Sequence, residues 1–308
     1  MNIRRATFIL TAAVLVFLGG GCASGNVSQQ MKAFNEKQAP AAPAIDEQDR
    51  TRNKSYEELL ALGDHALQAG NSQLAKLYYA MAGKRQAGTA EVLVGLGNVF
   101  LLEGQPLGAA RLFDEALSVD ESCAEAFHGA GKAYRLLKNH QLAAQYFEMG
   151  LELQKKPALF LNELALCMQN LDKFDEASRY LHKIIETGPP SSAAYNNLGF
   201  NDILLDDYDQ AVFHLEKARS LAPADGKVAN NLALAYALNG DFGKAGELFR
   251  RNLDTASALN NLGYIMMIQG NVDQAANYFS KALEEKPAFY IKAHENYEYL
   301  TGTNTLLN

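Results

Sequence analysis

The 308-residue chain contains no tryptophan, only three cysteines, and no apolar stretch long enough to cross a membrane as a helix. Its N-terminal apolar run covers residues 6–18, whereas a membrane-spanning helix needs about 20 residues. Because 48% of the residues are still hydrophobic, the composition is typical of a helical protein built mainly from alanine and leucine.

The chain also has fewer basic residues than acidic ones. The chain has 28 Lys and Arg against 35 Asp and Glu, which gives a net charge of −7. Loss of Arg4 and Arg5 with an N-terminal signal peptide would make the charge −9. Without a basic cluster interleaved with aromatic residues, nucleic acid is excluded as an expected partner.

The few cysteines do not predict a disulfide. Cys123 lies in a connection between helices and Cys167 in the middle of a predicted helix one repeat later, so their Cα atoms are expected to exceed the limit of about 7 Å. We expect Cys167 to be buried as a small apolar residue and Cys123 to be partly exposed.

Catalytic motifs are absent as well. The sequence has no nucleophile elbow, no HExxH and no paired CxxC, and its histidines are scattered. Gly129 to Lys132 resembles the end of a phosphate-binding loop, but Ala126 and Ala133 replace the required glycine and hydroxyl residue. The sequence therefore predicts no enzyme, no cofactor, no metal site and no small-molecule substrate.

The N-terminus has the features of a secretory signal peptide over residues 1–21: two arginines, the apolar run, and Gly19, Gly20 and Gly21 directly before Cys22. Small residues before a cysteine resemble the lipobox of bacterial lipoproteins, although Gly19 stands where that motif prefers leucine. The resemblance implies acylation of Cys22. Ordinary cleavage that leaves a free cysteine, and an uncleaved anchor, are the alternatives. Ala23 implies sorting to the outer membrane, facing the periplasm.

Residues 22–54 form the lipidated N-terminus and a polar segment without apolar periodicity, which predicts a flexible tether. As a coil it would span about 30 Å.

From residue 55 onward, three columns of residues repeat with a spacing of 34, interrupted once by a spacing of 30. A small residue occurs in a first helix at Gly63, Gly97, Gly131, Ala165, Gly199, Ala233 and Gly263. Alanine occurs in a second helix at Ala75, Ala109, Ala143, Ala177, Ala211, Ala245 and Ala275. A large apolar residue follows at Tyr79, Phe113, Phe147, Leu181, Leu215, Phe249 and Phe279. Small residues allow close helix approach, and the large ones fill the adjoining space.

This pattern, with proline closing several units, resembles the tetratricopeptide repeat (TPR). The resemblance implies an all-α, right-handed TPR α-solenoid of about seven helix-turn-helix repeats over residues 55–287, followed by a capping helix and tail at 288–308. Ser55 and Glu58 predict a capping box for the first helix. The sixth repeat is four residues short, at the end of its second helix or in the following turn.

The clearest repeat extends from Ser192 to Pro223, with its break at Asp206 to Tyr208. Asp206, Asp207 and Asp209 are expected to cap the second helix, not to bind calcium, because the glycine and distal glutamate of a calcium loop are missing.

Asparagines in the first helices of the late repeats are the predicted partner-binding residues. In TPR proteins the first helix lines the concave face, and a carboxamide both donates and accepts hydrogen bonds, so a ladder of them can bind a peptide backbone. The predicted groove consists of Asn162, Tyr195, Asn196, Asn197, Asp202, Asn230, Asn231, Asn260 and Asn261. The alternative is that the asparagines only satisfy adjoining turns.

Asp202 is unusual because other repeats have Phe100, Tyr134 or Tyr236 at its position. A buried carboxylate without a partner is costly. We therefore expect Asp202 to be exposed, with a polar contact in the groove as the alternative.

The signal peptide, lipobox, tether and late repeats, such as residues 231–251 and 261–279, together resemble the TPR lipoproteins of tight-adherence (Flp) pilus assembly, the TadD family. That resemblance implies a membrane-anchored scaffold of the cell envelope that assists pilus or outer-membrane secretin assembly. The alternatives are a type IV pilus TPR lipoprotein and an envelope adaptor for peptidoglycan hydrolases or proteases.

Overall fold

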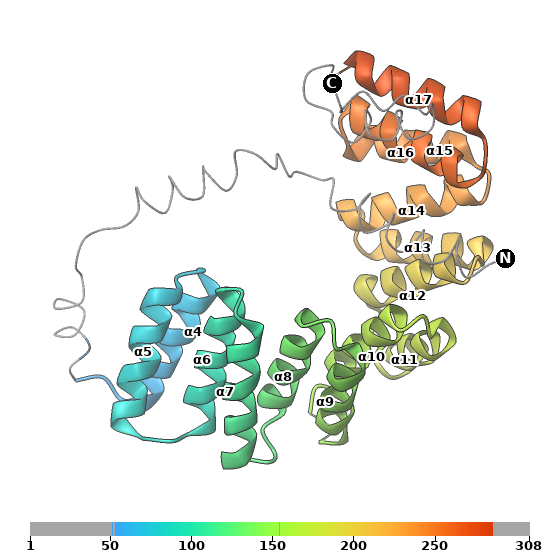
Figure 1. Cartoon of the computed structure of the whole chain (residues 1–308). Coiled ribbons are helices and arrows are strands. Elements are labelled where there is room, and N and C mark those ends of the chain that lie inside the picture. Colours follow the sequence, from blue (N-terminus) through green and yellow to red (C-terminus); the bar gives the residue numbers. More distant parts are fainter. Residues whose placement is uncertain (1–50, 52, 154, 286–308) are drawn as a thin grey trace. The chain divides into compact units, whose positions relative to one another are not determined.

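The computed structural model describes residues 51, 53–153 and 155–285, which contain fourteen helices and no strand (Figure 1). These residues divide into two compact units, which we call the N-terminal unit, up to residue 184, and the C-terminal unit, from residue 185. The signal peptide, most of the tether and the capping helix predicted at 288–308 lie outside the described residues.

The helices form seven successive pairs, one per predicted repeat. The first helices of the pairs are α4 (Tyr56–Gln68), α6 (Ala90–Leu102), α8 (Ala124–Leu136), α10 (Pro157–Asn170), α12 (Ser192–Leu204), α14 (Gly226–Leu238) and α16 (Thr255–Ile268). The second helices are α5 (Ser72–Arg85), α7 (Pro106–Val119), α9 (His140–Glu152), α11 (Phe174–Thr187), α13 (Tyr208–Leu221), α15 (Phe242–Asn252) and α17 (Val272–Glu285). The predicted all-α TPR solenoid class is confirmed, and α15 has 11 residues where most second helices have 14, as the shortened repeat required.

Short polar side chains begin many of these helices. The predicted capping box is present: Ser55 accepts from the Glu58 backbone N–H at 3.2 Å, and Glu58 accepts from the Ser55 N–H at 2.8 Å. Of the three aspartates expected to cap α13, Asp207 does so, by accepting from the Gln210 N–H at 3.2 Å. Asp206 instead accepts from the Tyr208 hydroxyl at 2.7 Å, and Asp209 accepts from Asn239 Nδ2 at 2.9 Å. Such caps satisfy backbone donors that the helix itself leaves free.

The turn inside each repeat contains one residue with a left-handed backbone. Four of these residues are glycine, but three others have φ between 57° and 62°. The seven positions are Gly70, Gly104, Lys138, Asp172, Asp206, Gly240 and Gly270. They have the same spacing as the repeat, so the turn conformation is kept even where the sequence supplies a side chain.

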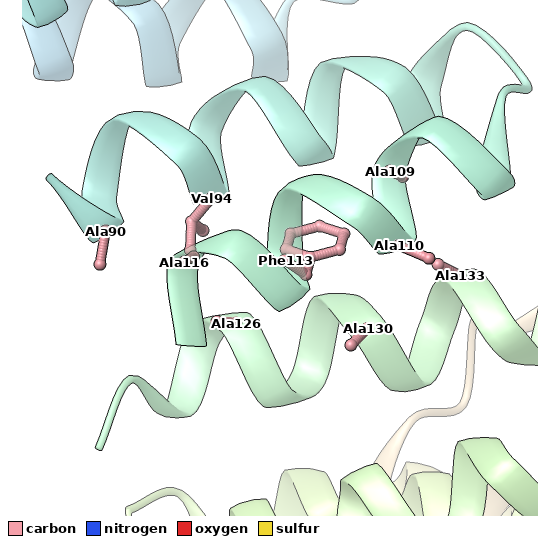
Figure 2. Packing of buried hydrophobic residues seen from close by; sticks show 9 residues of the cluster. All are labelled: Ala90, Val94, Ala109, Ala110, Phe113, Ala116, Ala126, Ala130 and Ala133. Carbon is pink, nitrogen blue, oxygen red and sulfur yellow. The ribbon is translucent and has the colours of Figure 1, made fainter. Parts of the chain in front are cut away.

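Packing in the N-terminal unit is organised around aromatic rings that lie between small residues. Phe113 on α7 is fully buried among alanines of α6, α7 and α8 (Figure 2). A Cβ added at Gly97 would lie 2.7 Å from this ring, and one at Gly129 would also overlap it. Gly131 contacts Phe147 in the same way, which supports a packing role for the glycines of the false phosphate loop.

The first repeat of the C-terminal unit has a leucine at the site of the ring, whereas the next two repeats keep phenylalanine. Gly199 on α12 approaches Leu215 on α13, where an added Cβ would lie 2.6 Å from the leucine Cγ. Both Leu215 and Phe249 are fully buried. The helix α14 between them has ten buried residues of its thirteen.

Candidate protein-binding surface

The predicted groove residues lie on the first helices α10, α12, α14 and α16, and each of them is buried or half-buried. In the C-terminal unit, Asn231 is 8% exposed, Asn260 is 5% exposed and Asn261 is 6% exposed. Tyr195 and Asn196 are half-buried. Asn162 is half-buried too and belongs to the N-terminal unit.

Three of the asparagine side chains are hydrogen-bonded to one another. Asn231 Nδ2 donates to Asn196 Oδ1 at 2.8 Å, which links α14 to α12. Asn196 Nδ2 in turn donates to Asn197 Oδ1 at 3.4 Å. The carboxamides therefore use part of their hydrogen-bonding capacity within the protein, where they stabilise the contact between neighbouring repeats.

Asn230 differs from its neighbours. Its Oδ1 atom is buried and, within the part of the chain that the structure describes, has no hydrogen-bond donor. A buried acceptor without a partner is costly and uncommon in native proteins. Asn230 Oδ1 is thus an acceptor without a partner in the described residues, and it could receive an N–H group from a bound peptide only if its side chain turned toward the groove.

Asp202 is buried, with 7% of its surface exposed, so the expectation that it faces solvent was wrong. Its carboxylate contacts His214 Nδ1 at 2.7 Å across the α12–α13 pair. The ring of Tyr195 stacks on His214 with centroids 6.3 Å apart, and Phe213 contacts the same imidazole edge-on at 5.2 Å. Sequence reasoning missed this partner because His214 lies on the other helix of the repeat, where no column pattern marked it.

A charged cluster on α8 and α10 was also not predicted. Glu163 Oε1 lies 3.4 Å from His128 Nε2, and Glu163 Oε2 lies 3.4 Å from Arg135 Nε. Burial favours a raised pKa for the Glu163 carboxyl, but its contacts with His128 and Arg135 hold the pKa below the ordinary value. The available signal was Glu163 itself, because it occupies a column that holds glycine or asparagine in most other repeats.

The two described cysteines are free thiols. Cys167 is buried and Cys123 half-buried, as predicted. Burial raises the pKa of Cys167 to about 12, which leaves its thiol protonated and unreactive at neutral pH. Cys22, the predicted lipidation site, lies outside the described residues.

The described residues offer no group of three or more His, Cys, Asp or Glu side chains arranged to hold a metal ion. None of the helices that the structure describes combines the length and apolar character needed to span a bilayer.

Comparison with protein-family models matches the tetratricopeptide repeat at residues 96–157, 205–252 and 256–289. No curated protein sequence matches the chain.

Solved structures of the same fold also match. A TPR protein from Parabacteroides merdae ATCC 43184 is 20% identical with a TM-score of 0.60, covering 81% of this chain and 100% of that one. The C-terminal part of a TPR repeat-containing protein from Cytophaga hutchinsonii is 14% identical with a TM-score of 0.55, covering 77% and 98%. The APC/C hetero-tetramer Cut9–Hcn1 contains a chain that is 16% identical with a TM-score of 0.61; the match covers 80% of this chain but only 52% of that chain.

The family models match tetratricopeptide repeats at these residues, and the repeat columns, the helix pairs and the similar solved structures show that the described residues have the fold of a TPR α-solenoid. Such repeats form scaffolds for protein–protein interaction, and the fold is typically not enzymatic. The protein is therefore a helical protein-binding scaffold.

Proposed function

We propose that this protein is a lipid-anchored scaffold of the bacterial cell envelope that assists assembly of the tight-adherence pilus by binding its outer-membrane secretin. The observation that carries the proposal is the succession, in one chain, of three glycines before Cys22, a polar tether and a TPR array. Acylation of Cys22 would hold the array at the outer membrane, and the tether would let it reach partners in the periplasm.

The first helices of the C-terminal unit support peptide binding by this scaffold. Asn196 and Asn231 fix one another through their 2.8 Å hydrogen bond, and the adjacent Asn230 has a carbonyl oxygen without a donor. An extended peptide offers a backbone N–H at every residue other than proline, so it can satisfy this buried acceptor, irrespective of its sequence, once the Asn230 side chain turns toward the groove.

The anchor is tested by metabolic labelling with a fatty acid. Wild-type protein should incorporate the label and fractionate with the outer membrane, whereas Cys22→Ser should do neither. Cys123→Ser is the matched control and should be labelled normally. Label that persists in Cys22→Ser would refute the anchor.

The partner is tested by co-purification from detergent-solubilised envelopes. We expect the tight-adherence secretin to co-purify with wild-type protein, and secretin multimers to be lost when the gene is deleted. Unchanged multimers and pili would refute the pilus role. Recovery of a type IV pilus secretin, or of a peptidoglycan hydrolase, would assign the scaffold to one of those systems instead.

A further inference from the structure

One face of α5 carries an apolar stripe, Leu77 and Met81, that the second helices of the other repeats do not have. The two residues lie one turn apart and are both half-buried. Met149, the same residue type in the Met81 column, is 50% exposed. All the equivalents of the stripe are exposed: Arg111, Gln145, Arg179, Phe213, Glu247 and Asn277 for Leu77, and Glu115, Met149, Lys183, Lys217, Arg251 and Lys281 for Met81. Repeat one therefore covers a face that the later repeats leave to solvent.

The chain that leads into repeat one contacts this stripe. Thr51 has a helical backbone and is only 1% exposed. Its hydroxyl donates to Met81 Sδ at 3.4 Å. The Lys54 N–H donates to the Thr51 carbonyl at 3.0 Å, so a single turn connects Thr51 to the start of α4 at Tyr56. The residues directly before Thr51 therefore begin at the apolar stripe.

The sequence before Thr51 has the features of a short helix with one large apolar residue. Proline is favoured at the first position of a helix, where Pro43 would stand. Asp46 in the first turn and Arg50 near the end have the charges that the helix dipole favours. Ile45 stands 34 residues before Tyr79, in the column of large apolar residues that fill the space between helices.

We propose that residues 43–50 form a short helix that covers the stripe of Leu77 and Met81 and closes the end of the array where no repeat precedes. In such a helix Ile45 lies about 9 Å from Thr51 along the axis, so it reaches Leu77 while Thr51 contacts Met81. The occupant is this segment, not a partner, because it is joined covalently to a residue already packed on the stripe. Its effective concentration there exceeds that of any separate molecule.

Docking of this segment changes the tether and the end of the array. Residues 22–42 alone would remain as a coil, with a typical span of about 25 Å. The open end of a repeat array exposes apolar surface, which favours association with a second copy, so the docked segment also keeps this end from self-association. Neither consequence depends on a secretin or on acylation of Cys22, so the inference goes beyond the proposed function.

The test is hydrogen exchange followed by mass spectrometry on the mature protein in detergent micelles. Amides 47–50 would be hydrogen-bonded within the helix, so they should exchange at least about tenfold more slowly than those of residues 24–40. Ile45→Asp should abolish this protection, because a carboxylate is not buried against the stripe without cost. Val27→Asp makes the same kind of change elsewhere in the tether and should leave the protection intact.

A second variant removes the stripe itself. Leu77→Gln with Met81→Gln should raise the exchange rate of amides 47–50 about tenfold. The matched control is Phe213→Gln with Met149→Gln, which changes exposed residues in the same two columns and should leave those amides unaffected. Ile45→Asp changes only the tether, so it decides the question even if the double variant of α5 does not fold.

Two results in the exchange experiment would overturn the proposal: wild-type exchange at amides 47–50 as fast as at residues 24–40, and protection that survives Ile45→Asp. Light scattering supplies a third. A protein mass that falls from two chains to one in Leu77→Gln with Met81→Gln would assign the stripe to a second copy. The fatty-acid labelling and secretin experiments are independent of these outcomes, since they report on Cys22 and on the partner.

Discussion

The junctions between repeats in the two units do not all use the same residues at the columns where one repeat packs on the next. In the N-terminal unit, Tyr79 lies between Gly63 and Gly95, and Phe113 lies between Gly97 and Gly129, with no room for a Cβ atom. At the junction of repeats five and six in the C-terminal unit, the ring is replaced by Leu215 and the second glycine by Asn231.

This difference shows that the same repeat can be joined to the next by apolar packing alone or by packing together with a side-chain hydrogen bond. A ring held between glycines fills the junction with apolar contacts alone. Leu215 is smaller than an aromatic ring. Asn231, which stands in the column of the second glycine, donates a hydrogen bond to Asn196 on the preceding first helix. Phe249 nevertheless precedes Asn261 in the next repeat, so ring size alone does not decide which residue the column takes.

The largest expected effect comes from adding one methyl group at a glycine that faces a ring. Gly97→Ala should lower the free energy of unfolding by about 2 kcal/mol, because the added Cβ would lie 2.7 Å from the fully buried Phe113 ring. The measurement is urea denaturation followed by circular dichroism.

Gly246→Ala in the C-terminal unit is the matched control for this substitution. Its Cβ would meet nothing closer than 3.7 Å, and alanine favours the helix, so it should stabilise by up to about 1 kcal/mol. A Gly97→Ala protein that unfolds like wild type would show that the ring can move.

The second comparison concerns the column that holds Tyr134 in the N-terminal unit and Asp202 in the C-terminal unit. Because Asp202 and His214 are buried and 2.7 Å apart, each single change to alanine should cost about 2 kcal/mol. The double variant should cost clearly less than the sum, since the two side chains share one interaction.

Tyr134→Phe is the control for this cycle. Its hydroxyl lies 3.5 Å from Asp114, at the limit of a hydrogen bond, so its loss should have a much smaller effect. Additive costs for Asp202→Ala and His214→Ala would contradict direct coupling of the pair.

A smaller change in the free energy of unfolding should distinguish an asparagine with a structural role from one that binds the partner. Asn231→Ala breaks a partly buried hydrogen bond and should lower the free energy of unfolding by about 1 kcal/mol. Asn230→Ala removes an acceptor that has no donor, so its stability should stay within about 0.5 kcal/mol of wild type while partner binding weakens. Loss of stability without loss of binding in Asn230→Ala would remove this residue from the binding surface.

Much of the fold could be predicted from the sequence because it depends on local spacing. The recurrence of Ala211 and its equivalents fixed the helix pairs, and Asp207 and Ser55 marked helix starts through short-range hydrogen bonds. The candidate binding site was harder to predict from the sequence. Its side-chain hydrogen bonds, between Asn231 and Asn196 and between His214 and Asp202, join different helices. Their geometry depends on how the helices pack, which no residue spacing specifies.

The smallest expected effect is an alkaline loss of stability at tyrosines that join neighbouring repeats. In the C-terminal unit Tyr236 donates to Glu216, and in the N-terminal unit Tyr146 donates to Asp114 at 2.7 Å. Burial, and then the hydrogen bond to Glu216, raise the pKa of Tyr236 to about 12. Burial and Asp114 raise the pKa of Tyr146 in the same way.

A raised pKa means that the unfolded chain releases the proton more readily than the folded one, so folding becomes less favourable as pH rises. The contribution of Tyr236 should be complete below pH 10, its ordinary pKa, and lost as the pH rises to about 12. Tyr236→Phe should flatten this part of the pH profile of urea denaturation, and Glu216→Gln should lower the tyrosine pKa in an absorbance titration. An unchanged titration in Glu216→Gln would show that burial alone sets the pKa, and that the carboxylate contributes nothing to the junction between repeats five and six.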